Sequence, residues 1–297
     1  KKDLVINHIT SIALHQSFLL IMAGFDTGRK QALRLRAMGF CGADDSIDPG
    51  LLQVLSAKYS WIEWGVLFRP DREGTPRYAS PAWVQELAEV NRENGSIMRL
   101  AAHLCQKHCQ EVLEGDASFT KELHGLGFSR VQINATAVNG VDMSKERFTE
   151  YASNLKTVME TVPEVEFIFQ LNSETQALYD LVSSDPPHNM SVLFDSSCGQ
   201  GIELTVLPAQ PADVPCGYAG GIGPDNIATV LESVMDQREH ITGSKPVWID
   251  MESSLRVARS DRMVLDQDVF SIDKCFACIK MGVFFGLPVS RFTVLTI

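Results

Sequence analysis

The sequence contains no long apolar segment. A helix that crosses a membrane needs about 18 or more consecutive apolar residues, and no such run occurs among the 297 residues. The most apolar N-terminal stretch, residues 4–24, is interrupted by polar side chains and keeps only residues 18–23 as a continuous apolar run. A secretory signal also needs a longer unbroken apolar segment. We therefore expect no membrane partner, and we interpret residues 1–30 as an N-terminal extension.

Basic residues are also scarce. The sequence has 26 Lys and Arg against 37 Asp and Glu, which gives a formal net charge of −11. Proteins that bind nucleic acids along the phosphate backbone use an excess of basic side chains, so we expect no nucleic-acid partner. An acidic protein can still hold a single phosphate group through its backbone amides.

The seven cysteines are too dispersed for a disulfide framework. Their number is odd, and they are spread from residue 41 to residue 278. Disulfide-stabilised domains are short, secreted and dense in cysteine. We therefore predict reduced thiols and a cytoplasmic location.

Short apolar runs and amphipathic segments alternate from residue 31 onward. Several runs, such as residues 165–169 and 191–194, are almost continuously apolar, which is typical of parallel strands buried on both faces. The eight predicted strands are residues 33–40, 61–68, 96–101, 129–134, 166–171, 191–194, 216–219 and 247–251.

Predicted helices lie between these strands. Two of them begin with a capping residue followed by proline, namely Asp48 before Pro49 and Ser80 before Pro81. The predicted helices are residues 49–58, 81–93, 119–126, 145–161, 174–183, 224–236 and 272–285, and the predicted long loops are residues 69–80, 106–118, 196–215 and 257–271. Eight strands in alternation with helices predict an α/β protein with a single (β/α)8 TIM barrel over residues 31–297, with enlarged loops.

The loops after the last two strands indicate a phosphate site. Functional residues of such barrels follow the C-terminal ends of the strands. Gly220-Gly221 follows the seventh strand and precedes a predicted helix, so its amides can approach an anion without interference from a Cβ atom. Ser253-Ser254 follows the eighth strand and offers further amides and hydroxyl groups. A tight turn would explain the glycine pair alone, but the serine pair after the next strand favours phosphate binding.

These strand-end motifs resemble those of phosphoribosylanthranilate isomerase, a (β/α)8 enzyme of tryptophan biosynthesis. The matching motifs follow the family's order from residue 41 to about residue 285, and they identify the strand that ends at Cys41 as the first of the eight. They are Cys41-Gly42, Gly65-Val66-Leu67-Phe68-Arg69-Pro70, Arg77-Tyr78-Ala79-Ser80, Val131-Gln132-Ile133-Asn134, Leu193-Phe194-Asp195, Gly220-Gly221-Ile222-Gly223-Pro224-Asp225-Asn226 and Asp250-Met251-Glu252-Ser253-Ser254.

The resemblance implies an isomerase that converts a phosphorylated aldose derivative into a ketose by an Amadori rearrangement. It implies that Cys41 is the base at C2 and Asp195 the acid at the ring oxygen, without a cofactor or a metal ion. A small phosphorylated substrate and a monomer or homodimer are expected. The implied substrate contacts are Arg77, Gln132 and Asp250, and the implied phosphate contacts are Gly220, Gly221, Ser253 and Ser254.

Departures from the family pattern leave the substrate open. The family's histidine after the fourth strand is Asn134 here, and the glycine-rich stretch after the sixth strand is reduced to Cys198-Gly199-Gln200-Gly201. Several loops are also longer. One alternative is therefore a barrel without catalytic activity that binds a phosphorylated ligand.

A second alternative is a zinc-dependent hydrolase. His103, Cys105, His108 and Cys109 fall within seven positions, and Cys275 and Cys278 form a CxxC pair. Zinc sites use such residues. The CxxC pair, however, falls in the apolar final helix on the outside of the predicted barrel, where packing is the better interpretation.

Overall fold

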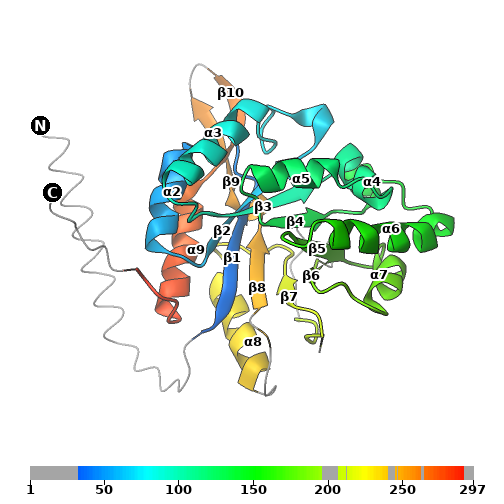
Figure 1. Ribbon diagram of the computed structural model, residues 1–297. Coiled ribbons are helices and arrows are strands. Elements are labelled where there is room, and N and C mark those ends of the chain that lie inside the picture. Colours follow the sequence, from blue (N-terminus) through cyan, green and yellow to red (C-terminus); the bar gives the residue numbers. More distant parts are fainter. Residues whose placement is uncertain are drawn as a thin grey trace, which may run out of the picture.

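Eight parallel strands form a closed barrel, with the strands in sequence order around it and helices on the outside (Figure 1). The computed structural model describes residues 33–195, 207–211, 213–239, 245, 247–261 and 264–290, so residues 1–30 lie outside the described part. The barrel strands are β1 (Leu35–Cys41), β2 (Ile62–Phe68), β3 (Arg99–Leu104), β4 (Arg130–Ile133), β5 (Glu166–Leu171), β6 (Met190–Phe194), β7 (Cys216–Tyr218) and β8 (Val247–Met251). The predicted (β/α)8 TIM barrel is confirmed, with every predicted strand present.

The helices follow the predicted order. They are α2 (Pro49–Lys58), α3 (Pro81–Glu93), α4 (Gln106–Leu113), α5 (Ser118–Gly125), α6 (Phe148–Thr161), α7 (Gln176–Ser183), α8 (Ile227–Glu239) and α9 (Ile272–Phe284). The predicted caps are present, since the side chain of Asp48 accepts a hydrogen bond from the amide of Gly50 and that of Ser80 accepts one from Trp83. Within the described residues, no helix has the length and apolar character needed to cross a membrane.

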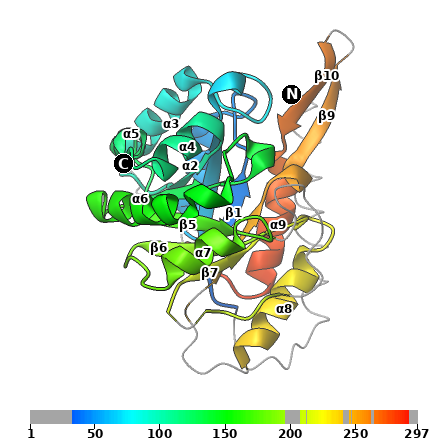
Figure 2. The same cartoon turned by 90° about the vertical axis from the view of Figure 1, so that its right-hand side faces the viewer.

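Two of the predicted loops are wrong. Residues 106–113 form α4 instead of a loop, with Cys109, Val112 and Leu113 buried on one face. Its first residue, Gln106, has a positive φ of 50°, and its N-cap makes no side-chain hydrogen bond, so the usual start signal of a helix is absent. Residues 257–271 contain most of a two-stranded antiparallel hairpin, β9 (Arg256–Asp261) and β10 (Val264–Phe270), which extends away from the barrel (Figure 2).

The barrel interior is layered. Along β5, Glu166, Ile168 and Gln170 point inward in turn, because alternate residues of a strand share one face. The middle layer is apolar and contains Ala37, Ile168, Leu193, Ala219 and Trp248. It separates a polar N-terminal end from a polar C-terminal end of the barrel.

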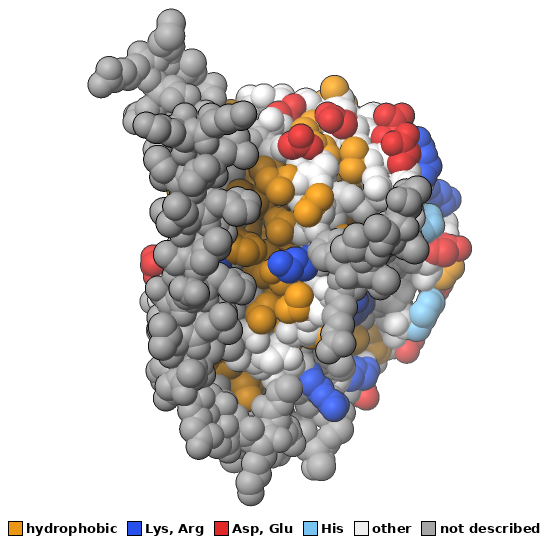
Figure 3. All heavy atoms as spheres, turned by 90° about the vertical axis from the view of Figure 1, so that its left-hand side faces the viewer, with side chains coloured by type: hydrophobic (Ala, Val, Ile, Leu, Met, Phe, Trp, Pro, Cys, Tyr) orange, Lys and Arg blue, Asp and Glu red, His pale blue; other side chains and the backbone are white. Residues whose placement is uncertain are grey.

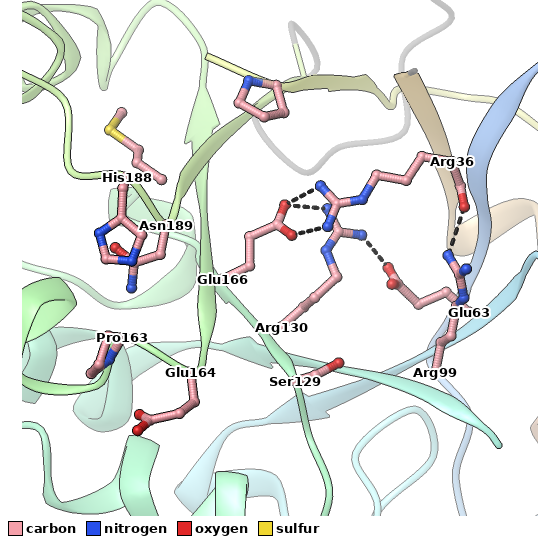
Figure 4. Close-up of a pocket in the computed structure, with 12 residues that line it drawn as sticks. Arg36, Glu63, Arg99, Ser129, Arg130, Pro163, Glu164, Glu166, His188 and Asn189 are labelled. Carbon is pink, nitrogen blue, oxygen red and sulfur yellow. Dashed lines mark hydrogen bonds and ion pairs between the residues drawn. The ribbon is translucent and has the colours of Figure 1, made fainter. Parts of the chain in front are cut away.

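Ion pairs fill the N-terminal end of the barrel (Figure 4). Buried Arg130 donates to Glu63 at 2.5 Å and to Glu166 at 3.1 Å, and its guanidinium lies 4.3 Å from the ring centre of Trp248. Arg36 donates to the same Glu166 at 2.8 Å. A pocket of 610 Å³ here is lined by three arginines and three glutamates, whose charges compensate one another. We assign this end of the barrel a structural role.

The outer face of α2 and α9 exposes apolar side chains (Figure 3). Leu51 and Val54 of α2 are 39% and 58% exposed.

Candidate functional site

A pocket of 460 Å³ lies at the C-terminal end of the barrel. It is formed by the ends of the strands and by the loops that follow them, as expected for a site on this fold. All the predicted substrate and phosphate contacts line it, together with the predicted acid: Arg77, Gln132, Asp195, Gly220, Gly221, Asp250, Ser253 and Ser254. The predicted base, Cys41, is not among the lining residues.

Cys41 lies beneath the pocket, in contact with a histidine. Its side chain is fully buried at the end of β1, and its Sγ is 3.2 Å from Nδ1 of His103 on β3. Burial, together with the charges of Glu252 and Asp250, raises the pKa of the Cys41 thiol well above its usual range. Burial lowers the pKa of His103 to about 3. At neutral pH the pair is therefore a protonated thiol beside a neutral imidazole.

Two glycines make room for this pair and for Asp250. A Cβ atom on Gly65 of β2 would lie 2.9 Å from Cα and Cβ of Cys41 and 3.0 Å from Nε2 of His103. A Cβ atom on Gly39 would overlap Oδ1 of Asp250. The absence of side chains at these two positions therefore lets Cys41, His103 and Asp250 converge.

Two buried aspartates face the pocket. Asp195, which follows β6, accepts a hydrogen bond of 2.7 Å from Nε2 of Gln170 on β5. Asp250 on β8 is 9% exposed. Burial and the charges of Glu63 and Glu252 raise the pKa of Asp250 well above its usual range, so this carboxyl group retains its proton to a higher pH than a free aspartate does.

Side-chain amides line the β4 side of the pocket. Nε2 of Gln132 donates to Oδ1 of Asn134 at 2.7 Å, and Nδ2 of Asn134 is 3.5 Å from Sγ of Cys105. Asn134 stands where the resembling family has a histidine. Its amide is held between two neighbours, and it cannot exchange protons as an imidazole does.

Arg77 is already paired with carboxylates. Its Nη1 donates to Oε1 of Glu252 at 3.0 Å and to Oγ of Ser253 at 3.3 Å, and its Nη2 is 3.8 Å from Oδ2 of Asp268. Its own amide donates to Oδ2 of Asp44, and the residue has a positive φ of 81°. An anionic group of a ligand would therefore share or displace these partners.

The glycine pair after β7 has the features of an anion site. Gly220 and Gly221 have φ values of 111° and 59°, which favour glycine. No hydrogen bond within the described part of the chain occupies their amides. Asn226 fixes the loop, since its Oδ1 accepts from the amide of Gly223 at 2.9 Å and its Nδ2 donates to the carbonyl of Gly221 at 3.0 Å.

The serine pair lies beside this loop, but its hydroxyl groups have other partners. Oγ of Ser254 donates to the carbonyl of Ile222 at 2.5 Å. Oγ of Ser253 accepts from Arg77. The hydroxyl of Ser254 thus joins the loop after β8 to the loop after β7, and the predicted contact of the serine pair with phosphate stays a prediction.

The alternative zinc cluster at residues 103–109 is not assembled. The side chain of His103 lies against Cys41, whereas Cys109 packs from α4 into the apolar core. His108 stacks on Phe119 with ring centres 3.6 Å apart. Cys275 and Cys278 are likewise buried in the core from α9, as the packing interpretation predicted.

Three residues of the site were missed from the sequence. The sequence groups His103 with its neighbours at residues 105–109, whereas the structure places it beside Cys41 and Asp250. Glu252 lies two residues after Asp250 and lines the same pocket, which the alternation of β8 indicates. Gln170 is the penultimate residue of β5, a strand that carries none of the motifs quoted above.

Comparisons with known proteins find similarity in structure only. No protein-family model matches the chain, and no curated protein sequence matches it. An L-ribulose 3-epimerase is 13% identical, with 84% of this chain and 95% of that chain covered and a TM-score of 0.45. A D-psicose 3-epimerase is 12% identical over the same shares of the chains, with a TM-score of 0.43. A mutant tryptophan synthase α-subunit from Pyrococcus furiosus is 13% identical, with 76% of this chain and 90% of that chain covered and a TM-score of 0.43. All three TM-scores are below 0.5, so these likenesses carry no conclusion about this chain.

Proposed function

We propose that the protein is an isomerase that converts a phosphorylated aldose derivative into a ketose by moving a proton from C2 to C1. One observation carries this proposal: a single pocket combines the loop amides of Gly220 and Gly221, which have no hydrogen-bond partner among the described residues, with the two buried aspartates, Asp195 and Asp250. The amides would hold the phosphate, and the carboxyl groups would lie over the sugar.

In this proposal Asp195 donates a proton to the ring oxygen and Cys41 accepts the proton of C2. The hydrogen bond from Gln170 fixes the orientation of the Asp195 carboxyl group. The thiol of Cys41 must lose its proton before it can accept another, and each unit by which its pKa is raised adds about 1.4 kcal/mol to that cost. The ring must also approach the floor of the pocket, because Cys41 lies beneath the lining.

Solvent deuterium tests the proposal. The protein is incubated in D2O with N-(5-phosphoribosyl)anthranilate and, separately, with ribose 5-phosphate, and the products are followed by NMR. We expect a ketose that carries deuterium at C1. Cys41→Ser and Asp195→Asn should each lower kcat by about 100-fold or more, the usual contribution of a general acid or base. Cys216→Ser, a change of a buried thiol outside the pocket, serves as the control and should leave kcat within about twofold.

A second candidate function is the binding of a phosphorylated ligand without turnover. It is favoured by one observation, namely that Cys41 is fully buried and does not line the pocket. Under this function the protein binds both compounds in calorimetry, and neither substrate gains deuterium. That result would replace the isomerase proposal.

A further inference from the structure

We propose that Cys41, His103 and Asp250 form a binding site for one divalent metal ion of the zinc class, and that occupancy of this site prevents Cys41 from acting as a base. The first part of this proposal is independent of the isomerase function, and the second part rests on it.

The three side chains converge from three strands of the barrel. They come from the ends of β1, β3 and β8, and one potential ligand atom from each lies within 4.8 Å of the other two. Sγ of Cys41 and Nδ1 of His103 are 3.2 Å apart. A tetrahedral zinc ion with Zn–S and Zn–N bonds of about 2.3 and 2.0 Å sets its sulfur and nitrogen ligands about 3.5 Å apart. The contact between Cys41 and His103 therefore needs to open by only a few tenths of an ångström, and the carboxylate of Asp250 completes the set from within 4.8 Å.

The donor set fits this class of metal ion. A thiolate, an imidazole and a carboxylate are all established zinc ligands, and a set of three leaves the fourth position free. Binding displaces the protons of the Cys41 thiol and of any protonated Asp250 carboxyl into solvent. The two negative charges that remain balance a divalent ion, and the imidazole binds in its neutral form.

The two arginines whose charges reach Cys41 and His103 are already paired with other side chains. The guanidinium of Arg77 is held by Glu252 and Ser253, and that of Arg130 is held by Glu63 and Glu166. Cys41 and His103 are 0% and 3% exposed. Asp250 lines the pocket, so an ion would enter from the pocket. Its free fourth coordination position would face the pocket.

Occupancy would change what the pocket can do. A thiolate that is bound to a metal ion no longer offers its free electron pair to a proton. A bound carboxylate of Asp250 is likewise withdrawn from the substrate. The metal-free protein is therefore the isomerase of the proposal above, and the metal-bound protein is its inhibited form.

Cobalt provides a spectroscopic test of the site. Metal-free full-length protein is titrated with Co²⁺, which takes the place of Zn²⁺ and gives an ultraviolet charge-transfer band when it binds a thiolate. We expect one equivalent to bind, with this band present, and one equivalent of Zn²⁺ to displace it. Cys41→Ser should remove the band, and His103→Asn and Asp250→Asn should each weaken binding by about 10-fold or more.

Cys105→Ser provides the matched control. Cys105 is a buried thiol that packs beside Cys41 but lies outside the cluster. This variant should keep both the band and the stoichiometry. Circular dichroism and thermal melting of each variant separate loss of the ligand from loss of the fold. A band that persists in folded Cys41→Ser protein, or the absence of stoichiometric binding by the wild type, would overturn the metal site.

The activity measurement separates the two parts of the proposal. Under the inhibitory scheme, one equivalent of Zn²⁺ abolishes isomerase activity and a chelator restores it. If Zn²⁺ binds with the expected ligands but activity rises, the inhibitory part and the role of Cys41 as a base are both wrong. If Zn²⁺ binds and neither form has isomerase activity, the metal site stands and the proposed function fails.

Discussion

At the scale of single residues, the site depends on two positions without side chains. A Cβ atom on Gly39 would meet Asp250. A Cβ atom on Gly65 would meet both Cys41 and His103. Packed interiors tolerate added atoms poorly, because neighbouring side chains must leave their preferred rotamers. The sequence shows both glycines. Their role could not be predicted from it, because it depends on which side chains of neighbouring strands lie against them in the folded barrel.

Gly39→Ala tests this requirement. The new Cβ atom would overlap Oδ1 of Asp250, so the carboxyl group must move. We expect the free energy of unfolding to fall by about 1–3 kcal/mol and kcat to fall with it, measured by urea unfolding and by the deuterium assay. Gly125→Ala is the control, because a Cβ at this helical position meets nothing within 4 Å. It should stabilise the protein by up to about 1 kcal/mol. Equal effects of the two changes would contradict this account.

At the scale of elements, the buried side chain of Arg256 helps to join the hairpin β9–β10 to the barrel. Arg256 donates to Oδ2 of Asp44, to Oδ1 of Asp268 and to the carbonyl of Gly42, each at 2.7 Å. Gly42 and Asp44 follow β1, and Asp268 also reaches Arg77 at the pocket. The hairpin therefore supports the rim of the pocket.

Arg256→Met should destabilise the protein strongly. The change leaves Asp44 buried without its cation, and loss of one partner of a buried ion pair costs about 3–5 kcal/mol. Arg147→Met provides the comparison, since Arg147 has three acidic partners, against two for Arg256, but lies on the surface. Exposed pairs contribute at most about 1 kcal/mol. Chemical denaturation of the two variants should give clearly different losses, and similar losses would argue against the supporting role of Arg256.

At the scale of the whole molecule, an apolar layer divides the barrel into a structural end and a functional end. Charges at the N-terminal end are paired, with Arg130 held by Glu63 and Glu166 and with Arg36 also on Glu166. The C-terminal end instead gathers Asp195, Asp250 and Glu252 around the pocket, where Arg77 is paired with Glu252. This division predicts that changes at the N-terminal end alter stability more than catalysis.

The pH dependence of stability tests the paired end. Burial alone would raise the pKa of Glu166, but Arg130 and Arg36 outweigh it and lower the pKa below the usual value of 4.5. Glu166 therefore binds fewer protons in the folded protein than in the unfolded chain at pH values just below 4.5, and stability falls as the pH drops through this range. Wild type should exceed Glu166→Gln in unfolding free energy at pH 7, and the difference should shrink between pH 4.5 and pH 3.

The exposed neighbour Glu164 provides the control for this measurement. Glu164→Gln should change the unfolding free energy by less than about 0.5 kcal/mol. A difference between wild type and Glu166→Gln that stays constant down to pH 3 would contradict the assigned role of the ion pairs.

The barrel was predictable because its signals are repeated and local. Each strand is a short apolar run, and the starts of α2 and α3 carry both a capping residue and proline. The hairpin β9–β10 was not predictable from such signals, because it is held by distant contacts such as Arg256 to Asp44. The same limit applies to the site: strand-end motifs indicated most of the pocket lining, whereas the contact of Cys41 with His103 depends on how β1 and β3 approach across Gly65.

A crystal structure with a bound phosphosugar product analogue tests the central claim most directly. The account predicts that the phosphate lies within hydrogen-bond distance of the amides of Gly220 and Gly221, with C2 of the sugar above Cys41 and the ring oxygen beside Asp195. A phosphate bound instead at the opposite end of the barrel, among Arg36, Arg99 and Arg130, would contradict it.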